Sequence, residues 1–260
     1  MAAIDITLRV ANAIGDVDAG AWDACANPRC TDEDGGSATE LSTLKAIYNP
    51  FISHDFLSAL EKSGSVRNRT GWQPMHLLAE AAGGGLLGAV PCYAKSHSQG
   101  EYVFDHGWAE AYERAGGSYY PKLQVSVPFT PAGGRRLLVR PGPQAEAVRA
   151  ALADGLAEVC RQSDASSVHV TFPTEPEWRL LGARGYLQRT HRQFHWENAG
   201  YPSFDAFLGA LSSRKRKIIR REREDALANG VSVHWLTGAE LTESVWDAFF
   251  NFYMETGSRK

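Results

Sequence analysis

The side chains of this chain that could move a proton are spread along its length. Histidine and glutamate act as general acids or bases near neutral pH, and tyrosine hydroxyls can assist them. A lysine on the polar side of the alternating stretch 119–129 belongs with them, although a salt bridge would explain it equally well. Each histidine alone is also compatible with a structural or a merely exposed position. The catalytic candidates by residue type are His106, Lys122, His169, Glu175 and His195, with His191, Tyr119 and Tyr120 beside them.

The densest charge in the chain is a basic run from Ser212 to Asp225. Seven Lys or Arg residues face three acidic ones there, a local charge of +4, while the whole chain carries −3. A basic patch on an acidic protein attracts polyanions such as tRNA, the pyrophosphate of CoA or a lipid-linked phosphate. A solvated helix face with internal ion pairs is the alternative. The candidate phosphate contacts are Arg214, Lys215, Arg216, Lys217 and Arg220.

A second basic cluster precedes the helix expected at 144–160. Arg135, Arg136 and Arg140 follow two adjacent glycines. The glycines indicate a turn, because they adopt positive φ at little cost. An anion is stabilised near a helix N-terminus. We therefore expect these three arginines to contribute to phosphate or anion binding.

Several classes of protein find no support in the sequence. It contains no Ser-His-Asp order, nucleophile elbow, P-loop or metal-ligand spacing, which argues against hydrolases, NTPases and metalloenzymes. Its N-terminus lacks the basic and apolar regions of a secretory signal, and no run of about 18 apolar residues is present. We expect a cytoplasmic protein with no membrane span, no metal and reduced cysteines. The acidic, Gly-rich stretch 31–37 indicates a solvated loop.

Hydrophobic periodicity divides the chain into strands and helices. Alternation of apolar and polar residues predicts strands, and apolar residues three or four apart predict helices. Trp246, Phe249, Phe250 and Tyr253 have helical spacing and are expected to form a core face. The expected strands cover 4–10, 75–82, 86–93, 119–129, 137–139, 167–172, 186–196 and 231–236. The expected helices cover 18–26, 53–64, 106–115, 144–160, 175–181, 203–229 and 242–256.

The order of these elements up to residue 200 is that of a mixed α/β domain. A helix, a strand and another helix follow, and no sheet is available for that strand. We therefore expect a first domain over 1–202 and the start of a second over 203–260. On this interpretation the chain is truncated at its C-terminus.

Four strings resemble the FemAB-like family of predicted N-acyltransferases, often labelled peptidoglycan biosynthesis or recognition proteins. The resemblance runs from about residue 50 to residue 260, and it covers His106 and His195. The strings are YVFDHGW at 102–108, KLQVSVPFTP at 122–131, QFHWEN at 193–198 followed by Gly200 and Tyr201, and SSRKRK at 212–217 with IRRER at 219–223.

The resemblance implies two GNAT-like domains in tandem, as in the bacterial Fem aminoacyltransferases that build peptidoglycan cross-bridges. It implies transfer of an acyl or aminoacyl group from acyl-CoA or aminoacyl-tRNA to the amine of a small molecule or peptide. The segment 128–136 departs from the GNAT pyrophosphate loop in its glycine spacing, and a strand is expected after it. Two alternatives therefore stay open: a non-catalytic binding module for a phosphorylated cell-wall precursor, and RNA binding through the basic run.

Overall fold

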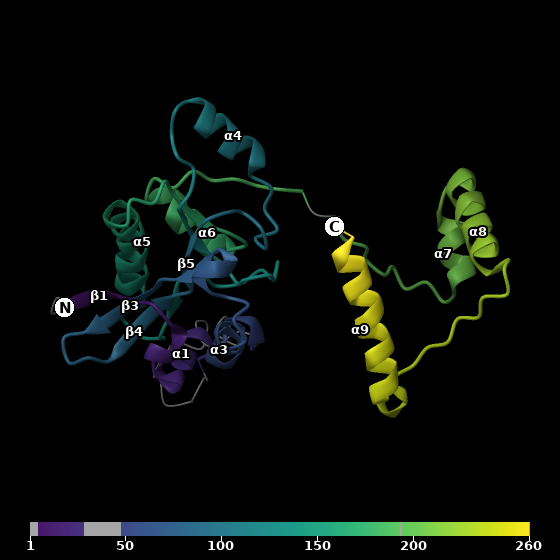
Figure 1. The fold of residues 1–260 in the computed structure, drawn as a ribbon, viewed down its shortest axis with the longest axis horizontal. Coiled ribbons are helices and arrows are strands. Elements are labelled where there is room, and N and C mark those ends of the chain that lie inside the picture. Colours follow the sequence, from purple (N-terminus) through teal and green to yellow (C-terminus); the bar gives the residue numbers. More distant parts are fainter. Residues whose placement is uncertain (1–4, 29–47, 193, 260) are drawn as a thin grey trace. The chain divides into compact units, whose positions relative to one another are not determined.

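The structure is a computed structural model that describes residues 5–28, 48–192 and 194–259. The expected loop at 31–37 lies outside these residues. The chain divides into two compact units, Met1–Thr190 and His191–Lys260. The domain boundary expected at 202/203 stays a prediction. The two units are described separately below (Figure 1).

The described part of the first unit contains two four-stranded sheets. Single residues, Met75 and Pro91, separate β2 from β3 and β4 from β5, so two hairpin arms run through both sheets. The first sheet is antiparallel, with the order β1-β3-β4-β7. The second has the order β2-β5-β6-β8, and its last pair, β6 and β8, is parallel. The strands are β1 Ile6–Ala11, β2 Trp72–Pro74, β3 His76–Ala81, β4 Leu86–Val90, β5 Cys92–Lys95, β6 Lys122–Val125, β7 Leu138–Val139 and β8 Val168–Val170.

The helices of the first unit begin at residues that cap them. Asp18 and Ser53 accept hydrogen bonds from backbone N–H groups three residues on, and Thr174 forms a capping box with Glu177. These caps satisfy donors that a helix start leaves without a partner. The mixed α/β class predicted from the sequence is thus confirmed. The helices are α1 Ala19–Ala26, α3 His54–Lys62, α4 His106–Arg114, α5 Ala145–Gln162 and α6 Glu175–Ala183.

The core lies on both faces of the first sheet, because its strands alternate between two apolar sides. Leu78 and Ala89 pack with Trp22 of α1 on one face. Their neighbours Leu77 and Val90 pack toward α5 on the other. Figure 1 shows α1 and α3 on one side of β3 and β4, with α5 on the opposite side. Apolar packing therefore covers both faces of the first sheet.

The second sheet has one apolar and one polar face. Leu123 and Val125 of β6 join the core under α5. Lys122 and Gln124 point to the other side, as the alternation predicted. All four residues of β6 are buried, so the polar face is enclosed within the protein. A buried polar face requires partners for its polar atoms, and it marks this sheet as the place to look for chemistry.

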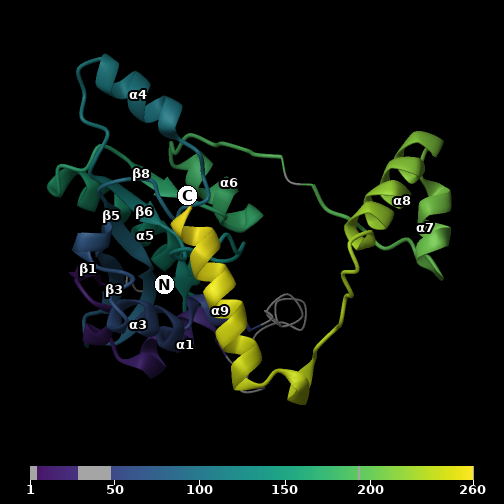
Figure 2. The same ribbon diagram turned by 45° about the vertical axis from the view of Figure 1, so that its right-hand side comes forward.

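The described part of the second unit contains three α-helices, α7 Phe204–Ala210, α8 Ser213–Leu227 and α9 Glu243–Ser258, and a short 3-10 helix at Gly238–Glu240. The single helix expected at 203–229 is wrong: it is interrupted at Leu211 and Ser212, and the Ser212 side chain caps α8. Both views show α7 and α8 side by side (Figure 2). An ion pair between Asp205 and Arg220 joins them at 3.7 Å.

Two further expectations fail in the second half of the chain. The strands expected at 186–196 and 231–236 are not formed in the described residues there. A strand is stable only beside another strand, and the described part offers them none. The four aromatic residues of α9 that were expected in a core are 50–66% exposed: Trp246, Phe249, Phe250 and Tyr253. None of the described helices is both long and apolar enough to cross a membrane.

Candidate active site

The centre of the candidate site is the ammonium group of Lys122 on the polar face of β6. Lys122 Nζ donates hydrogen bonds to Glu101 Oε2 at 2.8 Å and to Asp105 Oδ2 at 2.5 Å. A third hydrogen bond reaches Ser98 Oγ at 2.8 Å. All four residues are buried. One cation is therefore shared by two carboxylates in the protein interior, where charges interact more strongly than in water.

The connection between β5 and β6 positions these carboxylates. The two strands are antiparallel neighbours, yet residues 96–121 leave the sheet, form α4 and return. Asp105 directly precedes α4, and its carbonyl accepts the N–H groups of Trp108 and Ala109. The helix start thus fixes the backbone of Asp105 beside Lys122.

The network extends to the parallel strand β8 through Tyr119. The Tyr119 hydroxyl donates to Asp105 Oδ2 at 2.8 Å and lies 3.5 Å from His169 Nε2. The same His169 nitrogen lies 2.9 Å from Ser167 Oγ. A chain of polar groups therefore runs from Lys122 to an imidazole on the next strand.

Burial and charge set the protonation of these groups. Burial raises the pKa of Glu101 above its usual value, although the Lys122 ammonium opposes this effect. Burial acts in the same direction on Asp105, but hydrogen bonds led by that from Lys122 lower its pKa to about 2. Burial, reinforced by the charge of Lys122, lowers the pKa of His169 to about 4. At neutral pH the site holds a neutral imidazole and a carboxylate pair of unequal basicity.

Four buried oxygen atoms, two on the carboxylates that contact Lys122 and two on polar residues further along the same segment, have no hydrogen-bond partner among the described residues. They are Glu101 Oε1, Asp105 Oδ1, Gln124 Oε1 and Ser126 Oγ. The first three are hydrogen-bond acceptors when the carboxylates are ionised. Most buried polar atoms in proteins are satisfied, so two unpartnered carboxylate oxygens beside one cation are unusual. The site is therefore rich in acceptors and suited to a ligand that donates.

An open pocket of about 410 Å³ lies beside this network, with Leu60, Trp72, His97, Gln99 and Phe129 among its lining residues. Phe129 has a positive φ of 58°, a conformation that costs energy in a non-glycine residue. Its N–H donates to the carbonyl of Gly100, and its ring packs against Trp72 at 5.3 Å. The strained backbone is thus held where it forms a wall of the pocket.

The structure brings only some of the residues predicted from the sequence together. Lys122 and His169 are in one network, and Tyr119 joins them directly. Tyr120 reaches the same network through Ser98, at 2.8 Å between hydroxyl oxygens.

The remaining catalytic candidates of the first unit, His106 and Glu175, lie outside this network. His106, the first residue of α4, is exposed although Asp105 before it is buried. Glu175 is exposed and pairs with Arg179 on its own helix. Glu177, two residues on, is the buried one, and it accepts the N–H groups of Arg136 and Leu137. His191 and His195 are exposed residues of the second unit.

The arginines before α5 have different environments. Arg136 is fully buried, and its guanidinium donates to the carbonyls of Thr171, Ala132 and Arg135. It therefore has no exposed surface for an anion. Its hydrogen bonds join the segment 132–136 to Thr171. Arg135 is partly buried and donates to two carbonyls at the end of α1. Arg140, after β7, is exposed near the start of α5.

The basic run is placed on α8, as expected, and no residue of that helix is buried. A shallow hollow on its surface is lined in part by Arg216, Lys217 and Arg220. Two of its arginines form long ion pairs, Arg220 with Asp205 at 3.7 Å and Arg221 with Asp225 at 3.6 Å. The helix therefore presents a solvated basic surface.

Sequence reasoning missed Ser98, Glu101 and Asp105, the three groups that contact Lys122. The string YVFDHGW contains Asp105, and this was the available signal. The adjacent histidine attracted the prediction because histidine is the commonest acid–base residue type, whereas the structure exposes that histidine and buries the carboxylate. In the described ranges, no group of three His, Cys, Asp or Glu side chains could hold a metal ion.

Comparisons with known proteins place the chain in a family. Residues 13–260 match the family described as FemAB-like, peptidoglycan biosynthesis/recognition. The chain belongs to this FemAB-like family. Membership supports an acyl- or aminoacyl-transferase role in peptidoglycan biosynthesis. No curated protein matches the chain.

Two solved acetyltransferases are similar to the FemAB-like chain. One is from Trypanosoma brucei, with 14% identity and a TM-score of 0.36. The other is a GCN5-related N-acetyltransferase from Ralstonia eutropha JMP134, with 16% identity and a TM-score of 0.39. Each similarity covers 74% of this chain and 99% of the other.

Proposed function

We propose that the chain transfers an acyl or aminoacyl group to an amine that binds at the Lys122 network. The observation that carries this proposal is the pair of buried carboxylates, Glu101 and Asp105. Each has one oxygen on Lys122 and one without a partner among the described residues. An incoming ammonium group supplies the donors that these oxygens lack.

The network can also remove the proton that keeps an amine unreactive. Glu101, whose pKa is raised by burial, accepts a proton from the bound ammonium. The free amine then attacks the carbonyl carbon of the donor, a C–N bond forms, and the bond to sulfur or to ribose oxygen breaks. The second nitrogen proton leaves with the thiol or hydroxyl product. Lys122 keeps both carboxylates in position throughout.

The donor is acyl-CoA or aminoacyl-tRNA, both of which carry phosphates. Arg140 and the start of α5 offer one exposed positive region, and α8 offers another. A peptidoglycan precursor that bears an amine fits the family as the acceptor. Metal assistance is not required by this scheme, because the carboxylates provide the proton acceptor.

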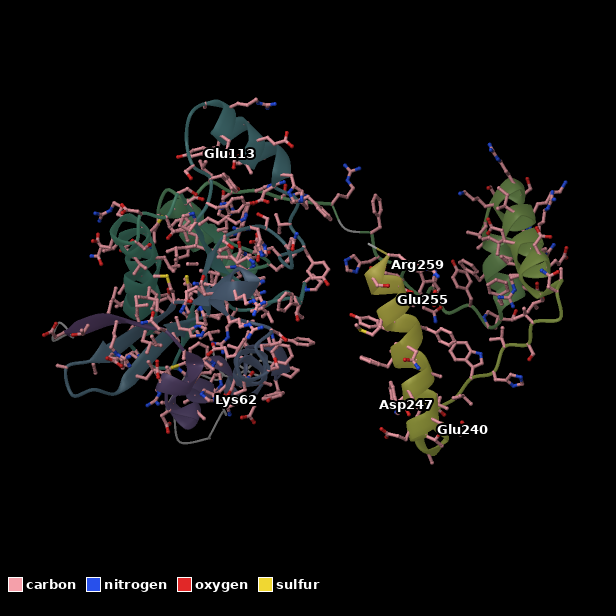
Figure 3. The ribbon with its side chains drawn as sticks, viewed as in Figure 1. Lys62, Glu113, Glu240, Asp247, Glu255 and Arg259 are labelled. Atoms are coloured by element: carbon pink, nitrogen blue, oxygen red, sulfur yellow. The ribbon has the colours of Figure 1, made fainter. Side chains whose placement is uncertain are left out.

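The test is a transfer assay with the full chain. Radiolabelled acetyl-CoA and charged tRNA are supplied in turn, with an amine acceptor, and labelled amide is measured. Glu101→Gln is expected to lower the rate by about 10²-fold, since one positioned base contributes about 10²–10⁴-fold. The matched control is Glu113→Gln on α4, an exposed glutamate shown in Figure 3. Transfer from neither donor, or equal loss in both variants, would overturn the proposal.

The second candidate function is non-catalytic binding of RNA or of a phosphorylated precursor through α8. Six of the seven basic side chains of that helix are exposed and Arg216 is partly buried, which favours this function. Binding of polyanions without any transfer, lost on removal of the α8 charges and unaffected by Glu101→Gln, would support this function instead.

A further inference from the structure

Lys95 is a buried cation whose environment differs sharply from that of its neighbour Lys122. The two residues are directly opposite one another in the antiparallel pair β5–β6. Like charges in that position repel and destabilise a sheet unless other groups offset them. Both carboxylates of the network contact Lys122. Lys95 has no ion-pair partner among the residues that the structure describes, although its side chain is fully buried.

The contacts of Lys95 lead to the pocket. Its ammonium lies 3.6 Å from the centre of the Trp72 ring and donates to the carbonyl of Gln99 at 3.2 Å. Both of these residues line the pocket. A cation over an indole face is stabilised, but one ring and one carbonyl leave hydrogen-bonding capacity of the ammonium unused.

Trp72 adds a second donor. Its Nε1–H is buried and has no partner among the described residues. The long edge of the indole that carries this group lies against Gly100, where a Cβ would be 3.3 Å from Trp72 Cζ2 and 2.7 Å from the Phe129 ring. Gly100 also has a φ of 79°, which other residues rarely adopt. The pocket wall is therefore closely built around an unsatisfied donor.

The Lys122 network and the neighbouring pair Lys95 and Trp72 thus differ in which hydrogen-bonding groups are unsatisfied. The carboxylates on Lys122 have oxygens without donors, whereas Trp72 Nε1–H has no acceptor among the described residues and the Lys95 ammonium has one, the carbonyl of Gln99. Lys95 and Glu101 are near enough to shift each other's pKa. A ligand that carries an ammonium and a carboxylate a few atoms apart would satisfy both regions. Leu60 and Phe129 offer apolar surface to the rest of such a ligand.

We propose that the pocket binds the carboxylate of an amino-acid-like acceptor, with Lys95 and Trp72 as its donors and the acceptor amine directed to Glu101 and Asp105. The amine half of this inference rests on the proposed function. The carboxylate half stands on the pocket alone. The substrate class is therefore a free amino acid or a short peptide with an apolar side chain.

The test measures binding by calorimetry at pH 7 with four probes: L-leucine, 4-methylpentanoate, 3-methylbutylamine and inorganic phosphate. Leucine carries both charged groups, and the next two probes carry one each. Lys95→Met is expected to weaken leucine and 4-methylpentanoate by at least about tenfold and to leave 3-methylbutylamine unchanged. Glu101→Gln is expected to weaken leucine and the amine but not the carboxylate.

The matched control is Lys62→Met, which removes the same charge from an exposed position at the end of α3 (Figure 3). Trp72→Phe keeps an aromatic ring, a smaller one, at this position and removes the indole N–H. It is expected to weaken 4-methylpentanoate several-fold, and it decides the question if Lys95→Met does not fold. Carboxylates that do not bind, or bind equally to both lysine variants, overturn the inference. Lys95-dependent binding of phosphate in place of carboxylates overturns it too.

The two proposals fail separately. Loss of Lys95-dependent carboxylate binding while amide transfer persists removes the substrate assignment alone. Carboxylate binding that depends on Lys95, in a chain that transfers nothing, removes the proposed function and leaves a carboxylate site.

Discussion

Lys122 on β6 and the lysines and arginines of α8 show how differently the same residue types behave in two parts of the molecule. Lys122 is buried and makes three short hydrogen bonds, two of them to carboxylates. The basic side chains of α8 belong to a helix without any buried residue. In the network each group fixes the charge and position of the next. On α8 the basic side chains contribute jointly to one positive electrostatic potential at the surface.

This difference has measurable consequences. A charge in the protein interior is little screened by salt and cannot be removed without leaving its partner unpaired. An exposed charge is screened and contributes little to stability on its own. We therefore expect single substitutions to decide the behaviour of the network, and only multiple substitutions to affect α8.

Lys122→Met is expected to have the largest effect. It leaves Glu101 and Asp105 buried next to each other without their cation, and breaking a buried pair in this way costs about 3–5 kcal/mol. The measurement is the free energy of unfolding in urea. Lys62→Met, the exposed control, is expected to change it by no more than about 0.5 kcal/mol. Equal values for the two variants would show that the network is not buried in solution.

Glu101→Gln is expected to lower amide formation by about 10²-fold, while leaving the fold intact. The amide retains the size of the side chain and can still accept from Lys122, but it cannot take up a proton. The loss should appear in kcat more than in KM if Glu101 acts as the base. A change confined to KM would make Glu101 a binding group only.

The polar face of β6 could be predicted from the sequence, and its partners could not. Alternation alone places Lys122 and Gln124 opposite Leu123 and Val125, and the structure confirms it. Glu101 and Asp105 lie in a connection without periodicity, so its return to the sheet is decided by packing. Local pattern predicts which side of a strand is polar, but not which loop covers that side.

The helix α9 also shows that local sequence pattern does not predict which residues a polar or apolar face contacts. The spacing of Trp246, Phe249 and Tyr253 predicts an amphipathic helix, and the helix is present. Their burial was expected, yet they are exposed in the second unit. Spacing defines an apolar face but not its partner. For the same reason, strands were expected at 186–196 and 231–236, where the described residues provide no neighbouring strand.

His169 is expected to make stability depend on pH between about 4 and 6.5. Its pKa is lowered to about 4 by burial, so the unfolded chain binds the proton first as the pH falls. This contribution is complete above 6.5 and is lost as the pH falls through 4. Glu101, with its raised pKa, acts in the opposite direction.

The measurement is urea unfolding at several pH values for the wild type and His169→Gln. The variant keeps Glu101, Asp105 and Lys122, so the difference between the two curves isolates His169. We expect a smaller loss of stability in acid for the variant. Parallel curves would show that the imidazole titrates alike in the folded and unfolded chains.

Carboxylate binding at Lys95 is expected to weaken as the pH rises. Burial lowers the pKa of Lys95 to about 8, with Glu101 opposing and Lys122 reinforcing the effect. His97 also faces Lys95, and its own pKa is lowered by burial and by that lysine. The affinity for 4-methylpentanoate should fall severalfold between pH 7 and 9. A constant affinity would show that Lys95 does not bind the carboxylate as a cation.

The smallest effect is expected on α8, from joint replacement of Arg214, Lys215 and Arg216 by alanine. Each phosphate contact on a single-stranded nucleic acid contributes about 0.7 to the slope of log affinity against log salt. Loss of three contacts should therefore reduce the slope for RNA binding by about 2, whereas each single replacement changes it by less than 1. Stability should stay within about 0.5 kcal/mol, because the helix buries none of these residues. An unchanged slope would make the basic helix a solvated surface, and only the buried network would then retain a role for its charges.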